Sequence, residues 1–422
     1  MRVRATLFLL LAFAVFPCAL QAREKSFRWP DGTLADEWFS KNVRKTSGRR
    51  FNILSYGASR GSSELQTEAI QRTIDAAYAA GGGVVVIPGG EWLSSSLFFK
   101  PGTSLFLATG ACLKGSDRIE DYPEAPVHIE GVLQPYVAAL VNAYGVDGFS
   151  ISGRGTIDGN GLVYWKAFWD RRAENKNCTN LEVRRPRLIY IAGSRDVSIS
   201  GVSLKNSGFW TTHLYKCSRV KIHGVNIFAP TSGVKAPSSD GIDLDACEDV
   251  RISGCTISVN DDFIALKGGK GPWADTLSDN GPVRRVLVER CSFGEGPHAL
   301  TFGSECYLAE NIIMRDCTVD GTRMLVRLKL RPDTPQIYRN IMVRGVRGTT
   351  DSVIHVRAWT QFFDPQGRED IPVSRIDSLT VSGCNISCRK VKNVKVSPSV
   401  GVINDLLILP DNSFTYRLST SL

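Results

Sequence analysis

The sequence predicts an all-β protein, a right-handed parallel β-helix with a helix over its N-terminal end. An eight-residue pattern recurs with apolar residues at its first, third, sixth and eighth places, as in Val197–Leu204 and Val220–Ile227. Successive starts lie 23 to 38 residues apart, with insertions of variable length. The period of two within each apolar pair is typical of strands, and the change of phase between pairs indicates a corner. Each coil would hide its apolar residues under the next.

Composition is compatible with this fold. The chain has 422 residues, of which 43% are hydrophobic and 22% charged, and this excludes a disordered, collagenous or low-complexity protein. The formal net charge of +9 is compatible with an acidic partner. Since no linker-like stretch interrupts the chain, we expect residues 23–422 to form a single domain.

The first residues predict export. A basic start, an apolar run over residues 5–16 and small residues after it are typical of a signal peptide. We expect residues 1–22 to be removed and the protein to be periplasmic or extracellular. No stretch approaches the roughly 20 apolar residues of a membrane span. A lipid attachment at Cys18 is the less favoured alternative, because Phe16 and Pro17 make a poor lipobox.

Further copies of the pattern start at Val250, Val286, Ile312, Ile341 and Leu379, and a stretched copy starts at Phe149. The sixth place is always Val or Cys, and it is Cys255, Cys291, Cys317 and Cys384 in four copies. Ten cysteines after Cys18 would suit a disulfide framework in an exported chain. Their repeated place instead favours small buried residues in an internal stack. No cysteine or histidine pair has zinc spacing, so we expect no metal site.

The open ends of the stack need covers. Residues 64–80 read as an amphipathic helix whose apolar side holds Leu65, Ala69, Ile70, Ile74, Ala77 and Tyr78. Three glycines then lead into a buried strand, Val84–Ile87. We expect this helix to cover the N-terminal end. Residues 389–422 lose the pattern and should form a last, irregular coil.

Charged residues gather in the strand that follows each copy. Asp262 and His298 both lie 12 residues after the start of their pattern, and the sequence around Asp240 aligns with both. Because neighbouring coils lie about 4.8 Å apart, these three side chains should form a column. Asp261 would lie beside that column.

The next coil adds two cations. Alternation over residues 326–330 buries the apolar residues and places Arg327 and Lys329 outward on the same surface. Aspartate ladders can also be solvated turns or calcium sites. Carboxylates stacked at about 5 Å repel, however, and should hold a proton near neutral pH. One protonated acid beside one ionised base suits hydrolysis of a glycosidic bond, and the cations suit an anionic sugar.

At these residues the sequence resembles glycoside hydrolase family 28, the polygalacturonases and their relatives. The four motifs of that family stand here in order as Ser238-Ser239-Asp240, Asn260-Asp261-Asp262, Pro297-His298-Ala299 and Arg327-Leu328-Lys329. Further likenesses are Phe51–Gly57 and Gly155–Gly161, so the resemblance covers about residues 51–390. It implies the pectin-lyase-like form of the β-helix and an enzyme that needs no cofactor.

The resemblance also implies roles. Asp261 would protonate the leaving oxygen, while Asp240 and Asp262 would activate water for inversion at the anomeric carbon. Arg327 and Lys329 would hold the galacturonate carboxylate, and His298 would support the sugar or the carboxylates. Stacking predicts shorter separations than the roughly 6.5–9.5 Å usual for inverting enzymes, so the expected inversion rests on the resemblance.

Two insertions and one histidine are further candidates. The stretch Lys267–Asp275 should rise beside the cleft, either as a neutral surface loop or as a wall that makes the enzyme exo-acting, with Trp273 as a sugar platform. Residues 165–187 are aromatic and basic, which suits an acidic polysaccharide more than nucleic acid in an exported chain. His213 would line the cleft or be a solvated surface residue. Pro297 and Ala299 replace the glycines of the family motif and put the substrate, not the catalysis, in doubt.

The leading hypothesis is an exported, exo-acting hydrolase of α-linked galacturonic acid that acts as a monomer on pectic polysaccharide or galacturonate oligosaccharide. A hydrolase of rhamnogalacturonan is the alternative within the same chemistry. Members with that preference tend to carry Glu in place of Asp262, so Asp262 favours homogalacturonan. A calcium-dependent pectate lyase, with Asp240, Asp261 and Asp262 as ligands, and a non-catalytic carbohydrate-binding β-helix are the other classes.

Overall fold

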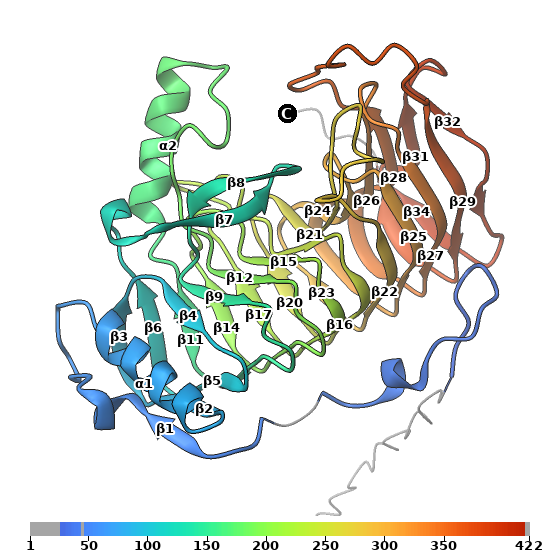
Figure 1. The fold of residues 1–422 in the computed structure, drawn as a ribbon. Helices are drawn as coiled ribbons and strands as arrows, with labels where there is room; N and C mark the ends of the chain where they lie inside the picture. The colour runs from blue at the N-terminus through green and yellow to red at the C-terminus, as the bar shows by residue number, and fades with distance from the viewer. Residues whose placement is uncertain (1–25, 44–45, 418–422) are drawn as a thin grey trace, which may run out of the picture.

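The computed structural model describes residues 26–43 and 46–417, and its stacked coils confirm the predicted right-handed parallel β-helix (Figure 1). The predicted signal peptide, including Cys18, lies outside the described residues. Apart from one hairpin, the paired strands are parallel, and each strand of a coil pairs with the equivalent strands of the coils before and after it. Such a ladder aligns equivalent residues of successive coils.

Three rows of strands run along the helix. The back row is a 13-stranded sheet of β1 (Arg50–Asn52), β2 (Gly83–Ile87), β5 (Thr103–Leu107), β10 (Ser150–Gly153), β13 (Ser198–Ser200), β16 (Ser218–His223), β19 (Glu248–Ser253), β22 (Val283–Glu289), β25 (Leu308–Arg315), β27 (Ile337–Arg344), β29 (Ser374–Ser382), β32 (Gly401–Ile403) and β33 (Leu406–Ile408). The second row is β3 (Gly90–Ser94), β6 (Ala111–Gly115), β11 (Thr156–Asp158), β14 (Ser203–Lys205), β17 (Asn226–Phe228), β20 (Thr256–Ser258), β23 (Ser292–Phe293), the first part of β26 (Thr318–Leu330) and of β28 (Arg347–Ala358), β30 (Asn385–Cys388) and β34 (Ser413–Tyr416).

The third row, called the cleft row below, carries the candidate site. It consists of β4 (Leu97–Phe99), β9 (Val141–Tyr144), β12 (Ile189–Ala192), β15 (Thr212–Tyr215), β18 (Ile242–Asp245), β21 (Asp262–Lys267), β24 (Gly296–Phe302), the second part of β26 and of β28, and β31 (Lys390–Lys395). The hairpin β7 (Glu124–Ile129)–β8 (Val132–Val137) is antiparallel and lies over this row (Figure 1).

Every copy of the eight-residue pattern forms a back-row strand, a corner and a second-row strand. Val220–Ile227, for example, spans β16 and β17. The corner falls at the fifth place, where the backbone is left-handed; Gly201 has φ 73° and Gly224 has φ 60°. Glycine meets this conformation without the steric cost that a β-carbon brings. The pattern therefore encodes both strands and the bend between them.

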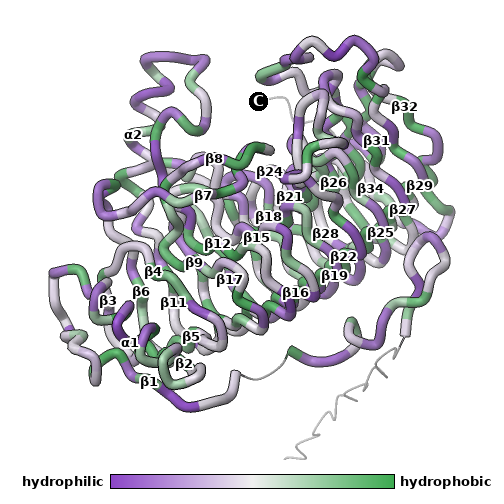
Figure 2. The backbone as a smooth tube through the Cα atoms, in the orientation of Figure 1, coloured by the Kyte–Doolittle hydropathy of each residue, from purple (hydrophilic) through white to green (hydrophobic). Residues whose placement is uncertain are grey.

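The interior is a continuous apolar stack. Figure 2 shows hydrophobic residues recurring along the strands of the stack, whereas the far end of α2 (Leu162–Glu174) is mainly hydrophilic. Cys255, Cys291, Cys317 and Cys384 lie in this core as free thiols, each 1% exposed. Several of these thiols donate to backbone carbonyls of their own or the preceding coil. The prediction that they are small core residues is confirmed.

The predicted capping helix is α1 (Thr67–Ala79), which packs against η2 (Ile53–Tyr56) and the first strands. It starts later than predicted, and Leu65 and Tyr78 are exposed rather than packed, at 39% and 48%. The buried face is instead Ala69, Ile70, Thr73, Ile74 and Ala77. The predicted strand after the glycines is β2. Residues 390–416 form the short strands of the predicted irregular last coils.

A segment that precedes the first coil runs back along the molecule (Figure 1). It contains η1 (Glu37–Ser40), and Trp29, Trp38 and Phe39 bury their rings in a small cluster with Leu287 and Ile313 of the back row. Lys221 donates to the Trp38 carbonyl at 2.7 Å. A further short helix, η3 (Ile119–Asp121), precedes the hairpin.

The cysteine stack gives a labelling prediction. In the folded protein we expect iodoacetamide to leave Cys255, Cys291 and Cys317 unmodified, because each is buried. After unfolding without reductant all three should be alkylated, because none forms a disulfide. Peptide mass spectrometry reads both states, with the partly exposed Cys112 as the reactive control. Two peptides joined through any of these sulfurs would contradict the structure.

Candidate active site

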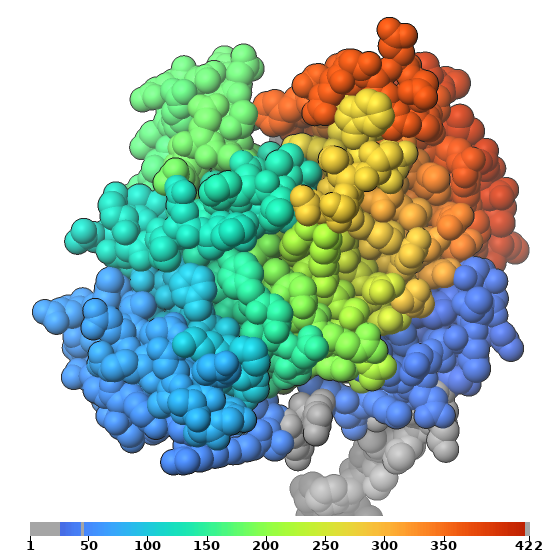
Figure 3. All heavy atoms as spheres, viewed as in Figure 1, coloured from blue at the N-terminus to red at the C-terminus, as the bar shows by residue number. Residues whose placement is uncertain are grey.

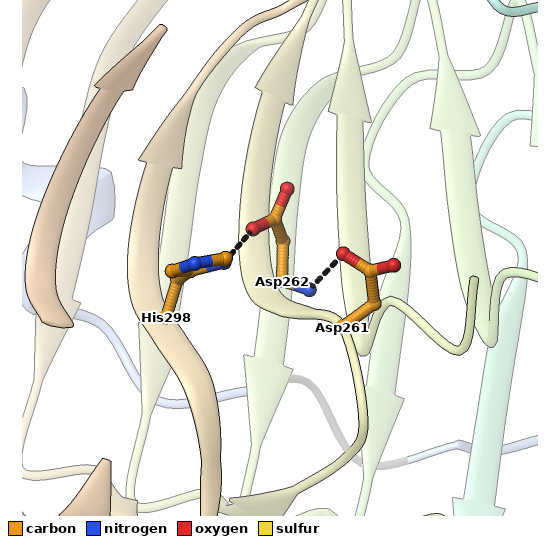
Figure 4. A group of neighbouring side chains, drawn as sticks. All are labelled: Asp261, Asp262 and His298. Atoms are coloured by element: carbon orange, nitrogen blue, oxygen red, sulfur yellow. Dashed lines mark hydrogen bonds and ion pairs between the residues drawn. The ribbon is translucent and has the colours of Figure 1, made fainter. Parts of the chain in front are cut away.

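The predicted column of charged side chains is present. The ladder pairs Asp262 with His298, and the pairing of Ile242 with Ile264 places Asp240 next to Asp262 on the preceding coil. Figure 4 shows Asp262 and His298 projecting from the adjacent strands β21 and β24, with Asp261 beside them in the bend that precedes β21. One carboxylate oxygen of each aspartate and one ring nitrogen of His298 lie within 4.8 Å of one another. The sequence therefore located these side chains correctly.

These residues line a cavity of about 310 Å³. Its walls include all six predicted charged residues: Asp240, Asp261, Asp262, His298, Arg327 and Lys329. Alternation in β26 places Arg327 and Lys329 on the cavity side, since Val326, Leu328 and Leu330 are buried in the core. The volume lies at the small end of the range for ligand sites, which is about 300–1,000 Å³.

Asp262 is the most heavily bonded carboxylate of the cavity. Its Oδ1 accepts from His298 Nδ1 at 2.5 Å and from Thr301 Oγ1 at 2.8 Å. Its Oδ2 accepts from Lys329 Nζ at 2.8 Å. Burial alone would raise the pKa of Asp262, but the positive charge of Lys329 and the hydrogen bonds from His298 and Lys329 hold it well below its usual value. Asp262 is therefore ionised.

Asp261 and Asp240 are shifted in the opposite direction. Burial and the negative charge of Asp262 raise the pKa of Asp261. Burial and Asp261 raise the pKa of Asp240 well above its usual value, although Lys267 Nζ lies 3.5 Å from its Oδ2 and opposes the shift. The pKa of Asp262 is thus lowered while those of Asp261 and Asp240 are raised. Such a separation of pKa values between neighbouring carboxyl groups is what acid–base catalysis needs.

His298 links the carboxylate to a cation. Because its Nδ1 donates to Asp262, its Nε2 is free to accept from Arg327 Nη1. Burial lowers the pKa of His298 to about 4, and Arg327 contributes to that shift. A neutral imidazole with this tautomer holds the Arg327 guanidinium in place beside the cavity.

Two further residues of the site were not predicted. Lys267 was assigned to the inserted loop, but it ends β21, where its ammonium contacts Asp240, Asp243 at 3.3 Å and Glu305 at 3.4 Å. Trp359 lines the cavity with Arg327 and Lys329 over its ring, 5.2 and 5.0 Å from the centroid. Lys267 ends the strand that carries Asp262, and Trp359 directly follows β28, the next strand of the row after β26. Following the cleft row to these two positions would have identified both residues.

The expectation for His213 was wrong. The side chain is fully buried rather than lining the cleft or facing solvent. Its Nδ1 accepts from Arg187 at 2.9 Å, and its Nε2 lies 3.1 Å from Asp245 Oδ2. The hairpin β7–β8 covers this part of the cleft row, and His128 Nδ1 from the hairpin bonds the same oxygen at 2.6 Å. Sequence alternation could not reveal this cover, because the hairpin comes from far upstream.

The loop at residues 268–282 rises beside the cavity as predicted, but Trp273 does not line that cavity. Its ring is 42% exposed and carries the Arg368 guanidinium at 5.0 Å from its centroid. The loop instead meets the hairpin, through Lys270 and Glu130 at 3.6 Å and through Asn280 and His128 at 3.3 Å. Figure 3 shows this contact between the teal and yellow atoms.

The second predicted insertion contributes to the same wall. It forms α2 and the segment after it, and Arg172 and Asn180 line the cavity together with Glu130 of the hairpin. Asn180 Nδ2 donates to Glu130 Oε1 at 2.8 Å. Two of its aromatic side chains, Trp165 and Phe168, are 3% exposed and pack in the protein. This insertion is therefore part of the cavity and not only a surface feature.

A cation site at Asp261, Asp262 and His298 fits poorly with these contacts. Both oxygens of Asp262 already accept hydrogen bonds, and one of the donors is an ammonium. Lys267 and Arg327 lie beside the same cluster. The acidic ligand set is thus already neutralised by protein cations, which oppose the binding of a further positive ion.

In the part of the chain that the structure describes, no helix is long and apolar enough to cross a membrane.

Comparisons with known proteins add an independent result. Residues 117–355 match the model of the family described as glycosyl hydrolases family 28. A probable polygalacturonase from Vitis vinifera is 26% identical over 306 residues, which are 70% of this chain and 60% of that protein. An endo-polygalacturonase from Pectobacterium carotovorum subsp. carotovorum is 28% identical over 271 residues, covering 60% of this chain and 63% of that protein. The chain thus spans about three fifths of the length of these relatives.

The fold has solved counterparts. The structure of a family 28 exopolygalacturonase from Yersinia enterocolitica superposes with a TM-score of 0.71. The superposition covers 94% of this chain and 80% of that one, at 20% sequence identity. At this level of identity the comparison establishes a shared β-helix fold.

The buried His213 gives a stability prediction. Its pKa is about 3 in the folded chain, mainly because of burial, and about 6.5 when unfolded. Between these values only the unfolded chain takes up the proton, so this contribution to stability is complete above pH 6.5 and is lost as the pH falls. From pH 7 to pH 5 the loss should be about 2 kcal/mol.

Urea unfolding at pH 7 and pH 5 checks this expectation. The substitution His213→Gln should reduce the pH dependence of the unfolding free energy by that amount, whatever its effect at pH 7. His223→Gln is the matched control, because His223 is exposed on the back row. Equal pH dependence in the wild type and in His213→Gln would show that His213 is not buried as a neutral group.

Proposed function

The chain belongs to glycosyl hydrolases family 28, and we propose that it hydrolyses α-linked galacturonic acid in pectin from a chain end. One observation carries this proposal. Asp262 is held ionised by Lys329 and His298, directly beside Asp261, whose pKa is raised. An acid and a base share one cavity, whose walls also carry the cations Arg172, Lys267, Arg323, Arg327 and Lys329. That combination suits hydrolysis of a bond between acidic sugars.

The reaction needs only these side chains and water. Asp261 transfers its proton to the glycosidic oxygen as the bond from the anomeric carbon to that oxygen breaks. A water molecule attacks the anomeric carbon, and its proton passes to Asp262, assisted by Asp240. The products are two saturated sugars, and the transferred protons leave Asp261 ionised and the base protonated until solvent exchange restores both.

The cations bind the substrate carboxylate. Arg327 lines the cavity, where His298 accepts from its Nη1 and holds the guanidinium in place. A guanidinium can hold a carboxylate through two parallel hydrogen bonds. Trp359 supports both Arg327 and Lys329 and presents an apolar ring at the cavity, which suits the face of a sugar. His298 acts as a positioning residue, because it holds Arg327 rather than the substrate.

Exo action is supported by the closed end of the cleft row. The hairpin covers β15 and β18, so Asp243, Asp245 and His213 are buried at 0–1% exposure. Glu130 and Asn180 then close the cavity on that side. A polymer cannot pass through such an end, so its terminal unit must enter the cavity. The names of the relatives include both endo and exo enzymes, and do not decide between the two modes.

Inversion of the anomeric carbon is part of the proposal, and it rests on the family resemblance. The nearest oxygens of Asp261 and Asp262 lie within 4.8 Å, less than the roughly 6.5–9.5 Å usual between inverting carboxyl groups. Asp240 offers a second position for the base. Export by a signal peptide at residues 1–22 stays a prediction.

The proposal predicts a specific product. Wild-type protein incubated with polygalacturonate and a chelator should release saturated monogalacturonate, detected by mass spectrometry. Asp261→Asn should reduce the rate by about 10²–10⁴-fold, the usual contribution of a general acid. Asp405→Asn, an exposed aspartate at the C-terminal end, is the matched control and should keep full activity.

The other outcomes identify the alternatives. Saturated oligomers instead of monomers would mean endo action. Products from rhamnogalacturonan alone would move the enzyme to that polymer. Unsaturated products, or activity that the chelator abolishes, would indicate a metal-dependent lyase. No turnover of either polymer would contradict the proposed function.

A further inference from the structure

The cleft row continues beyond the cavity, and its outward residues stay cationic. The ladder pairs Arg327 of β26 with His355 of β28, and Lys329 with Arg357. It pairs Arg357 in turn with Lys395 of β31. Neighbouring coils lie about 4.8 Å apart. Lys329, Arg357 and Lys395 therefore occupy one place in three successive coils, leading away from the end that the hairpin closes.

These side chains face outward. Ile354 and Val356 of β28 are buried in the core, so alternation places His355 and Arg357 on the same side as Arg327 and Lys329. Arg357 and Lys395 are exposed. Across residues 26–43 and 46–417, neither of them forms an ion pair with an acidic side chain. Arg323, at the cavity wall, has no acidic partner within those ranges either.

His355 shows that these charges converge. His355 is 4% exposed, and the ladder places it between Arg327 of β26 and Asn393 of β31. Asn393 Nδ2 donates to its Nδ1 at 3.0 Å. Burial lowers the pKa of His355 to about 4, and the positive charges of Arg327, Arg357 and Lys395 add to this shift. Among the described residues, no acidic side chain forms an ion pair with Arg357 or Lys395. Uncompensated cations on one surface raise the local concentration of anions and favour an anionic ligand.

We propose that Arg357 and Lys395, with His355 and Asn393 between them, form an additional subsite that binds the carboxylates of galacturonate units beyond the cleavage point. This inference rests on the proposed function. The terminal sugar would occupy the closed cavity, and the rest of the chain would run along the cationic coils. We call these four residues the outer subsite.

The test compares substrates of different length. In the wild type, kcat/KM should rise from the galacturonate dimer to the tetramer, because only the longer chain reaches the outer subsite. In Arg357→Gln/Lys395→Gln the ratio of kcat/KM for tetramer to dimer should fall about tenfold, which corresponds to about 1.4 kcal/mol of lost binding. The loss should appear in KM rather than kcat, since the contacts are far from the reacting bond.

A matched control separates this site from net charge. Arg154→Gln/Arg347→Gln removes the same charge from two exposed arginines outside the cleft row and should keep the wild-type ratio. The inference is overturned if Arg357→Gln/Lys395→Gln keeps that ratio. It is also overturned if both double variants reduce the ratio equally.

A binding arm keeps this inference distinct from the proposed reaction. Calorimetry with the galacturonate tetramer would use Asp261→Asn, with and without the Arg357→Gln/Lys395→Gln pair. Weaker binding in the triple variant supports the outer subsite even if the wild type shows no turnover, and in that case only the proposed reaction fails. Equal binding in both contradicts the outer subsite. No binding to either contradicts the subsite and the proposed function together.

Discussion

The parallel ladder between coils determines this site, because it places equivalent residues about 4.8 Å apart in every turn. The backbone pairing of β18 with β21 places Asp240 and Asp262 next to each other. Like charges at that distance repel, so some carboxylates must keep their protons and some cations must lie nearby. Lys267, Lys329 and Arg327 are those cations. The resulting division of protons is the chemical basis of the proposed reaction.

The same ladder gives the cleft a direction. On the N-terminal side, an antiparallel hairpin leaves the stack and covers the row. Its His128 bonds Asp245 of the row, and its Glu130 forms an ion pair with Lys270 of the neighbouring loop. On the C-terminal side, the row continues with exposed Arg357. A covered end and a cationic open end follow from inserting one hairpin into a regular stack. The proposed exo action and the proposed outer subsite both depend on this difference between the two ends of the row.

Much of this could be predicted from sequence because the fold repeats. The apolar pattern located the strands, the corners and the buried cysteines, and it placed Asp240, Asp262 and His298 in one column. Repetition carries no information about what an insertion covers. His213 follows the outward alternation of its strand, yet it is buried, because a hairpin about 80 residues upstream lies over it.

Trp273 and Trp359 show the same limit. Trp273 was chosen for its aromatic ring in an inserted loop, but a loop's path depends on tertiary contacts such as the one with Arg368. Trp359 comes directly after β28, a regular strand of the cleft row, and the ladder brings it to the cavity beside Lys329. Side chains on the ladder were therefore predictable, whereas those on insertions were not.

The most direct test of the central claim is the anomeric form of the first product, followed by proton NMR during early hydrolysis of a galacturonate oligomer. Water activated by Asp262 and Asp240, with Asp261 as the acid, predicts inversion of the α-linkage and β-galacturonate as the first product. Release of the α-anomer would contradict the account, since it would require a carboxylate to act as a nucleophile at the short separation observed here.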